Sequence, residues 1–260
     1  MSTGIIAALI LSGVTVGFIN TLAGGGTIIS LSLFMFLGLP PTVANGTNRI
    51  AVIIQNLVAV GNFRKQKILD TSKGIRLAIP TTIGSVIGAS IGATIDQHTF
   101  EVCFGVIMLM MLALLIFKPE KWLHGNTDLA QKPISAASYI TFFLIGIYGG
   151  FLHVGVGYFI LAGAVLGCGL DLVKANAIKN LIVLCYVPFS LLVFIFNKQV
   201  MWEYGLIHAI GNVIGAYVAS KWAIKLGSNF IRWIMVVLIL ISVLQMFNIV
   251  DFKSLLNLAK

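Results

Sequence analysis

The chain opens with an apolar segment that is too long to cross a membrane as one straight helix. Residues 4–37 carry no charged side chain. As a helix they would extend about 51 Å, whereas about 20 residues span the hydrocarbon core of a bilayer, about 30 Å thick. Three consecutive glycines, Gly24, Gly25 and Gly26, interrupt the segment. Glycine is a poor helix former, so we expect the helix to break there.

The composition indicates that lipid surrounds most of the chain. Of its 260 residues 58% are hydrophobic and 10% are charged, whereas soluble domains carry about 25% charged residues. No basic segment precedes the first apolar run, so we do not interpret that run as a cleaved signal peptide. The apolar runs cover residues 4–37, 42–63, 75–95, 100–117, 135–167, 172–196, 202–224 and 229–249. This pattern predicts an all-α polytopic protein of about 8–10 helices that crosses the bacterial inner (plasma) membrane several times.

The opening pattern occurs a second time in the chain. An offset of 131 residues, as between Gly24 and Gly155 (155 − 24), also pairs Gly26 with Gly157 and Asn45 with Asn176. A later motif repeats at residues 84–88 and 211–215. We therefore predict two homologous repeats of four apolar runs each, at residues 1–117 and 135–260, with a linker at 118–134. The first run of each repeat is expected to break at its glycine cluster.

The glycine clusters allow two interpretations. Small residues often form surfaces on which membrane helices pack closely. Alternatively, each cluster interrupts a helix, and unwound backbone is tolerated inside a membrane only where it is buried in protein or lines a cavity. Two interruptions at matching places in two halves indicate a transporter binding site, and our functional hypothesis follows this second interpretation.

The loops indicate how the chain is oriented. Residues 64–76 contain five cations and one acid, which is typical of a cytoplasmic loop. In the second half the basic cluster, Lys221, Lys225 and Arg232, follows the third run instead of the second. This difference favours an inverted arrangement of the two halves. The net charge of +9 is attributed to such loops and not to nucleic-acid binding, because the cations are dispersed and not interleaved with aromatic residues.

Each half carries one cation and one amide at equivalent interior positions. Asn48 corresponds to Lys179 and Arg49 to Asn180, so the order is swapped. Interior charge is costly and usually faces a cavity or a partner. Asn45 lies on the same helical face as Asn48 and Arg49, and Asn176 repeats that position in the second half. These faces offer hydrogen-bond donors and positive charge, which suits a small oxyanion.

Some interior residues leave the choice of role open. Arg49 is expected to contribute charge to a binding site, but a long cationic side chain can also extend to the membrane surface. His153 can be a neutral histidine packed beside the glycine break, or it can titrate and couple transport to protons, since an unperturbed histidine has a pKa near 6.5. The helix that begins near Thr27 is expected to add a positive dipole end. Gln55 and Asn212 are further interior amides.

The absence of several motifs narrows the function. No Asp or Glu lies deep in an apolar run, which argues against a cation pathway. The sequence contains no Walker A motif, no H-E-x-x-H and no G-x-S-x-G, so we expect no catalytic residue, cofactor or metal. Two rivals remain, a passive anion channel and an intramembrane enzyme, for which Ser30, His153 and His208 are the only plausible catalytic residues.

A glycine cluster followed by a proline and asparagine corner, present twice, resembles the TauE/SafE family over nearly the whole chain. The matching residues are Gly24-Gly25-Gly26, Gly38-Leu39-Pro40 and Ala44-Asn45-Gly46-Thr47-Asn48, then Gly155-Val156-Gly157, Gly169 and Ala175-Asn176-Ala177. The second cluster departs from the first because Val154 and Val156 are interleaved with its glycines. The resemblance implies a secondary transporter that moves sulfite, sulfonates or similar sulfur-containing anions, usually outward.

These observations predict a substrate site between the two repeats. It is expected to contain Asn20, Gly24, Gly25, Gly26, Asn45, Asn48, Arg49, His153, Gly155, Gly157, Asn176, Lys179 and Asn180. The expected partners are the anion and the lipid bilayer, with no nucleic acid. The sequence leaves a homodimer open.

Overall fold

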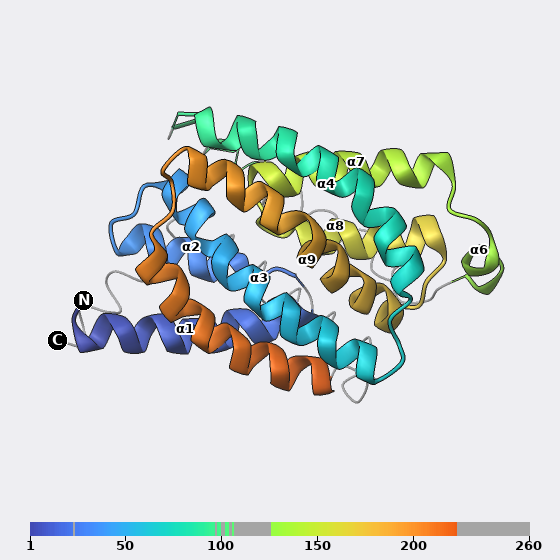
Figure 1. The fold of residues 1–260 in the computed structure, drawn as a ribbon, viewed down its shortest axis with the longest axis horizontal. Helices are drawn as coiled ribbons and strands as arrows, with labels where there is room; N and C mark the ends of the chain where they lie inside the picture. Colours follow the sequence, from blue (N-terminus) through green and yellow to red (C-terminus); the bar gives the residue numbers. More distant parts are fainter. Residues whose placement is uncertain (23, 97, 100–101, 104–105, 107–125, 223–260) are drawn as a thin grey trace.

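The structure is a computed structural model that describes residues 1–22, 24–96, 98–99, 102–103, 106 and 126–222. These residues form an all-α fold and contain no strand (Figure 1). In the first half the helices are α1 (Thr3–Leu22), α2 (Thr27–Phe36), α3 (Pro41–Lys65) and α4 (Thr71–Thr94). Next come α6 (Thr127–Gln131), α7 (Ala136–Phe151), α8 (Val156–Ala162) with the π-helical turn η2 (Gly163–Gly167), α9 (Leu172–Phe196) and a helix over residues 202–222. The run 229–249 and most of the run 100–117 lie outside the described residues.

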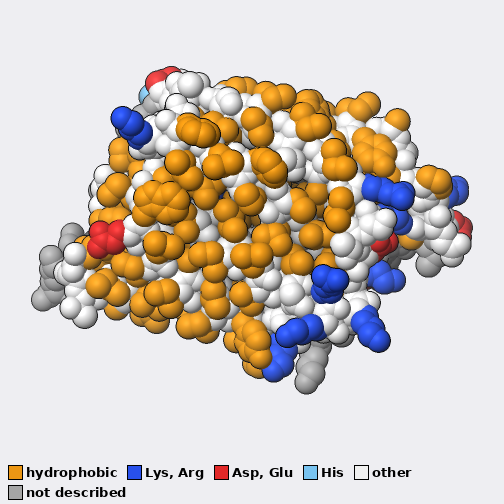
Figure 2. Space-filling model, in the orientation of Figure 1, with side chains coloured by type: hydrophobic (Ala, Val, Ile, Leu, Met, Phe, Trp, Pro, Cys, Tyr) orange, Lys and Arg blue, Asp and Glu red, His pale blue; other side chains and the backbone are white. Residues whose placement is uncertain are grey.

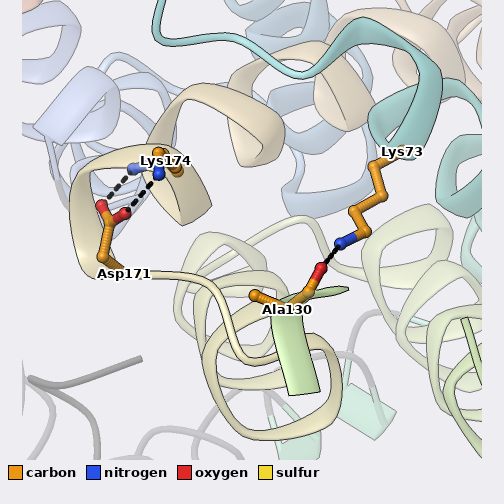
Figure 3. A network of polar contacts seen from close by, with 4 residues as sticks. All are labelled: Lys73, Ala130, Asp171 and Lys174. Atoms are coloured by element: carbon orange, nitrogen blue, oxygen red, sulfur yellow. Dashed lines mark hydrogen bonds and ion pairs between the residues drawn. The ribbon is translucent and has the colours of Figure 1, made fainter. Parts of the chain in front are cut away.

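Local sequence signals set where these helices begin. Pro41 stands at the first position of α3, where its missing N–H is not needed. Asp70 caps α4 by accepting a hydrogen bond from the Lys73 amide at 2.9 Å. Asp171 caps α9 in the same way through the Lys174 amide at 2.9 Å, and it also forms an ion pair with the Lys174 ammonium at 3.3 Å (Figure 3). These signals therefore set the first residues of the three long helices α3, α4 and α9.

Backbone conformation recurs at the 131-residue offset. Helices α3 and α9 both have 25 residues and begin at Pro41 and Leu172. Left-handed φ angles occur at Gly24 (90°) and Gly155 (66°), and again at Lys67 (58°) and Lys198 (57°). The breaks, the long helices and the turns after them therefore occupy equivalent positions in the two halves.

The first helices of the two halves run in opposite directions. Helix α4 runs beside and parallel to α7, since Gly84 lies against Phe143 and Gly88 against Ile147. Helix α1 runs in the same way beside the helix over 202–222, with Gly13 against His208. That helix begins where α4 ends, because the Gln199 side chain donates from Nε2 to the Ala93 carbonyl at 2.8 Å. Helices α1 and α7 therefore enter the molecule from opposite ends, as Figure 1 shows.

Each broken segment is a hairpin that returns to the end from which it entered. The Ser138 hydroxyl at the start of α7 donates to the Gly167 carbonyl at the end of η2, at 3.1 Å. Helix α2 leads through residues 37–40 into α3, whose start lies beside the loop that precedes the helix over 202–222, where Thr47 Oγ1 accepts from the Met201 amide at 2.9 Å. Both helix breaks therefore lie at the inner tips of these hairpins.

The two halves exchange their fourth helices. Glycines of α4 lie against the backbone of α7, and Gly211 and Gly215 in the helix over 202–222 lie against the backbone of α1 near Ile10 and Val14. A Cβ atom at these glycines would collide with backbone carbonyls, so only small residues permit the contact. Each half therefore packs its first helix on a helix supplied by the other half.

The surface agrees with a location in a membrane. Helices Thr3–Leu22, Thr71–Thr94 and Leu172–Phe196 are long and apolar enough to cross a bilayer. Figure 2 shows apolar side chains over the face of the molecule, with most of the cations at one end. At that end the Lys73 ammonium donates to the Ala130 carbonyl of α6 (Figure 3), so α6, which falls inside the predicted linker, is joined to the start of α4. The chain is thus a membrane protein with one strongly basic end.

The close contact between α4 and α7 is testable by substitution. We expect Gly88→Ala to lower the free energy of unfolding in detergent by about 1–3 kcal/mol, because the added Cβ meets the Ile147 carbonyl. The matched control is Gly61→Ala in α3, where a Cβ would meet no atom within 4 Å. It should leave stability unchanged or raise it slightly. Equal effects of the two substitutions on thermal unfolding would contradict the contact.

Candidate functional site

The two helix breaks meet in the interior. Helix α1 ends at Leu22 and α2 begins at Thr27, while α7 ends at Phe151 and α8 begins at Val156. A Cβ on Gly24 would lie 2.5 Å from the Cα of Gly157. Gly24 is also in a left-handed conformation, so both its φ angle and the space around it require glycine.

A small cavity lies at this junction. Both breaks and the two long helices α3 and α9 contribute to its wall. The lining residues are Asn20, Gly24, Thr27, Val52, Gln55, Asn56, His153, Val156, Gly157, Lys179 and Val183. Lys179 is the only Lys or Arg among these described residues, and none of them is an Asp or Glu.

Lys179 reaches from α9 to the end of α1 in the other half. Its side chain is only 1% exposed. The ammonium donates to the Asn20 carbonyl at 2.7 Å and to the Thr21 carbonyl at 3.1 Å. Asn180 adds a hydrogen bond from Nδ2 to the Thr21 carbonyl at 3.2 Å. The last carbonyls of a helix lack partners within the helix and carry a partial negative charge, so Lys179 stabilises the broken end of α1.

Arg49 has the reciprocal position. Its guanidinium extends from α3 and donates to the carbonyls of Gly149 at 3.3 Å and Gly150 at 2.5 Å, near the end of α7. It also donates to the Ser190 hydroxyl at 2.7 Å, and its Cζ lies 4.7 Å from the centre of the Phe194 ring. The side chain is completely buried and does not line the cavity. Each half therefore uses its interior cation to hold the broken helix of the other half, and neither cation extends to the membrane surface.

The amides near the breaks mainly satisfy the backbone. Asn45 donates to the Phe151 carbonyl at 2.8 Å, and Asn48 accepts a hydrogen bond from the Ser30 hydroxyl at 2.6 Å. Asn20 Oδ1 accepts from the Thr27 amide at 3.1 Å and its Nδ2 donates to the Thr27 hydroxyl at 3.2 Å. The first amide of α2, to which the sequence assigned an anion-binding role, is thus bound by Asn20. The side chain of Asn176 is buried and has no hydrogen-bond partner among the described residues.

The two interior histidines occupy different environments. His153 lies in the second break with a left-handed φ of 54°, and its Nδ1 lies 2.8 Å from the Tyr186 hydroxyl. It contributes to the cavity wall. His208 instead contacts the Leu9 carbonyl at 2.9 Å through Nδ1 and does not line the cavity. Its contacts join the helix over 202–222 to α1.

The cavity contains part of the predicted set of site residues. Asn20, Gly24, His153, Gly157 and Lys179 line it. The others surround the breaks without lining the cavity, and they are Gly25, Gly26, Asn45, Asn48, Arg49, Gly155, Asn176 and Asn180. The predicted site residues do not include Thr27, Val52, Gln55, Asn56, Val156 and Val183, which also line it.

Helical spacing was the signal that could have found several of the missed residues. On α9, Val183 lies one turn after Lys179, and on α3, Val52 lies one turn after Asn48 and one turn before Gln55 and Asn56. The valines could not be predicted in the same way, because an apolar residue in an apolar helix has no feature that marks it as part of a cavity wall.

The sequence is similar to those of known membrane proteins. The family described as sulfite exporter TauE/SafE matches residues 9–246. The chain belongs to the TauE/SafE family. A probable membrane transporter protein of Haemophilus influenzae is 26% identical over 90% of this chain and 91% of its own length. The probable membrane transporter protein ORF9 of a Sinorhizobium species is 24% identical over 90% of this chain and 88% of its own length.

A third relative is named in the same terms. The probable membrane transporter protein YfcA of Escherichia coli K12 is 24% identical over 85% of this chain and 81% of its own length. No solved protein structure is significantly similar to the chain. The family and its named relatives identify the chain as a membrane transporter of this family.

The clamp that Arg49 forms is testable separately from transport. We expect Arg49→Lys to lower the free energy of unfolding by about 3 kcal/mol or more, because an ammonium does not reproduce the fork that binds Gly149, Gly150 and Ser190. Arg64→Lys, at an exposed position on the same helix, is the matched control and should change stability by less than about 0.5 kcal/mol. Thermal unfolding in detergent measures both, and an Arg49→Lys protein as stable as the control would contradict the clamp.

Proposed function

We propose that the chain is a secondary transporter that exports a small sulfur-containing anion, such as sulfite or a sulfonate, through the bacterial plasma membrane. The anion binds in the cavity between the two halves. The observation that carries this proposal is the Lys179 ammonium, which is buried in the cavity wall without a carboxylate among the described lining residues. A buried cation without a counter-ion is costly, and a bound anion offsets that cost.

The basic end of the molecule is proposed to face the cytoplasm. Cations concentrate where α3 ends and α4 begins, and Figure 2 shows most of the cations at one end. Lys198, which follows α9, is exposed at the opposite end, where the Gln199 side chain contacts the end of α4. Short cytoplasmic loops carry an excess of Lys and Arg. In this orientation the α7 hairpin enters from the cytoplasm and the α1 hairpin from the outer side.

Support for alternating access comes from the hairpins and their clamps. The breaks meet near the middle of the molecule, and each is held by a cation of the opposite half. Transporters with inverted repeats move one unit against the other around a fixed central site. Here each moving unit would contain elements of both halves. The hairpin of one half packs against a helix of the other half, α7 against α4 and α1 against the helix over 202–222.

The transport assignment is tested by anion uptake into proteoliposomes. We expect wild-type protein to accumulate labelled sulfite or methanesulfonate against its gradient, and Lys179→Met to lose at least about 90% of this uptake, since the anion loses its counter-charge. Lys174→Met, which alters an exposed cation on the same helix, should transport normally. A Gln55→Leu variant, whose native Oε1 has no hydrogen-bond partner among the described residues, separates loss of binding from loss of folding and should also transport poorly.

Two results would contradict the transport assignment. Flux that never exceeds equilibrium and does not saturate would indicate a passive channel. Uptake that is unchanged in both Lys179→Met and Gln55→Leu would mean that the anion does not bind in this cavity.

His153 is proposed to couple transport to protons. It lines the cavity and contacts Tyr186, so a proton on its ring would lie next to the anion. We expect an imposed pH gradient to drive methanesulfonate uptake in wild-type vesicles and to lose this effect in His153→Gln, which retains a polar side chain but cannot carry the proton. The measurement is uptake with and without the gradient at equal membrane potential. An unchanged response in His153→Gln would exclude His153 as the coupling group.

A further inference from the structure

The first helices of the two halves do not end at equivalent residues. Helix α1 ends at Leu22, which corresponds to position 153 at the 131-residue offset (22 + 131). In the second half α7 already ends at Phe151, and His153 has a left-handed φ of 54°. The left-handed glycines Gly24 and Gly155 do occupy equivalent positions. Helix α1 therefore continues two residues closer to its break than α7 does.

The hydrogen bonds that hold the two helix ends differ in the same direction. In half one, Arg49 and Asn45 bind the carbonyls of residues 149, 150 and 151. Positions 18, 19 and 20 correspond to these residues at the same offset. In half two, however, Lys179 and Asn180 bind the carbonyls of residues 20 and 21. The side chains of half two therefore hold α1 nearer to its break than the side chains of half one hold α7.

Asn176 is left without a partner by this difference. Its equivalent, Asn45, donates to the Phe151 carbonyl at 2.8 Å, and the residue that corresponds to Phe151 is Asn20. The Asn20 carbonyl instead accepts from the Lys179 ammonium at 2.7 Å. Asn176 is only 1% exposed, and neither polar atom of its side chain is hydrogen-bonded within the described part of the chain. A buried amide without partners is costly, and a hydrogen bond in a second conformation would offset that cost.

The equivalence of the halves defines such a second conformation of α1. If α1 adopted the conformation of α7, its last two residues would unwind and the helix would end at Asn20, as α7 ends at Phe151. The Asn20 carbonyl would then lie beside Asn176, as the Phe151 carbonyl lies beside Asn45. The Lys179 ammonium would lose one of its two carbonyl partners. In transporters built from inverted repeats one unit moves against the other during the cycle, so the two halves can exchange conformations.

We propose that Asn176 is a positioning residue for transport, which takes the Asn20 carbonyl from Lys179 in the second state of the cycle. The exchange frees the ammonium in the cavity wall and keeps the carbonyl hydrogen-bonded, which lowers the cost of unwinding a helix inside a membrane. Asn176 does not line the cavity, so it affects the rate of the conformational change and not the affinity for the anion. This inference rests on the proposed transport function.

Asn176→Leu tests the role, because leucine has nearly the same shape and forms no hydrogen bond. We expect the maximal rate of methanesulfonate uptake into proteoliposomes to fall at least about tenfold, which corresponds to the loss of one buried hydrogen bond. The half-saturating concentration should change less than about twofold. The midpoint of thermal unfolding in detergent should stay the same or rise, because the side chain makes no hydrogen bond in this conformation.

Asn45→Leu is the matched control, since Asn45 is the equivalent residue and its hydrogen bond is already formed. We expect this variant to lower the unfolding midpoint by about 3 °C or more. An Asn176→Leu protein that is destabilised as much as Asn45→Leu would show a structural role for Asn176 and overturn the proposal. A stable Asn176→Leu protein that transports at the wild-type rate would overturn it as well.

Hydrogen exchange tests the same step without an anion. The amides of Thr21 and Leu22 are helical in this conformation and open in the second one. We expect them to exchange about tenfold more slowly in Asn176→Leu than in wild type, because the open state has lost its hydrogen bond. Exchange in α4 should be unchanged. Equal exchange of Thr21 and Leu22 in the two proteins would contradict the proposal.

The two measurements separate this inference from the function on which it rests. If the wild-type chain moves no anion while exchange at Thr21 and Leu22 still depends on Asn176, the transport assignment fails and the exchange of partners stands. If the wild-type chain transports anions and Asn176→Leu matches it in rate and in exchange, the role of Asn176 fails and the transport assignment stands.

Discussion

The structure depends on how the carbonyl groups at two helix ends are satisfied inside a membrane. Water is absent there, so unpaired backbone groups are costly. At the end of α7 the partner is the Arg49 guanidinium, and at the end of α1 it is the Lys179 ammonium. Both cations come from the opposite half. The breaks are thus stabilised only when the two halves are assembled together, which makes the junction between them both a structural necessity and the place where a cavity forms.

The two clamps are not equivalent, and this asymmetry gives the site its chemistry. Arg49 has additional partners in Ser190 and Phe194 and is sealed from the cavity. Lys179 lies in the cavity wall and keeps one N–H uncommitted. The clamp on the second break therefore lies outside the cavity, while the clamp on the first break forms part of its wall. If an anion binds there as proposed, it shares one ammonium with the carbonyls of Asn20 and Thr21, which links the bound anion to the end of α1.

Much of this arrangement was accessible from the sequence. The length of the first apolar run and the glycines at 24–26 indicated the first break, and the cost of interior charge indicated that Arg49 and Lys179 matter. The sequence did not show what these cations bind. Their partners are backbone carbonyls of the other half, and carbonyls have no sequence signature. For the same reason Arg49 was expected in the cavity, whereas its side chain binds the end of α7.

The close approach of α1 to the helix over 202–222, and of α4 to α7, was also absent from the sequence interpretation. The motifs at 84–88 and 211–215 marked a duplication, but their packing partners lie in the opposite half. Glycine spacing shows that a helix can approach another closely and does not identify the other helix. Val52 and Val183 illustrate a related limit, because apolar residues in an apolar chain give no contrast until the cavity is seen.

The central claim is that a positive charge at position 179 binds the transported anion, and chemical restoration of that charge tests it most directly. In a chain whose native cysteines are replaced by serine or alanine, Lys179→Cys should transport no anion. Alkylation with 2-bromoethylamine converts that cysteine to an aminoethyl side chain that differs from lysine by one sulfur, and it should restore most of the saturable uptake. An equally long neutral alkylating agent should restore none. Equal uptake after charged and neutral modification, or full uptake before either, would contradict the account.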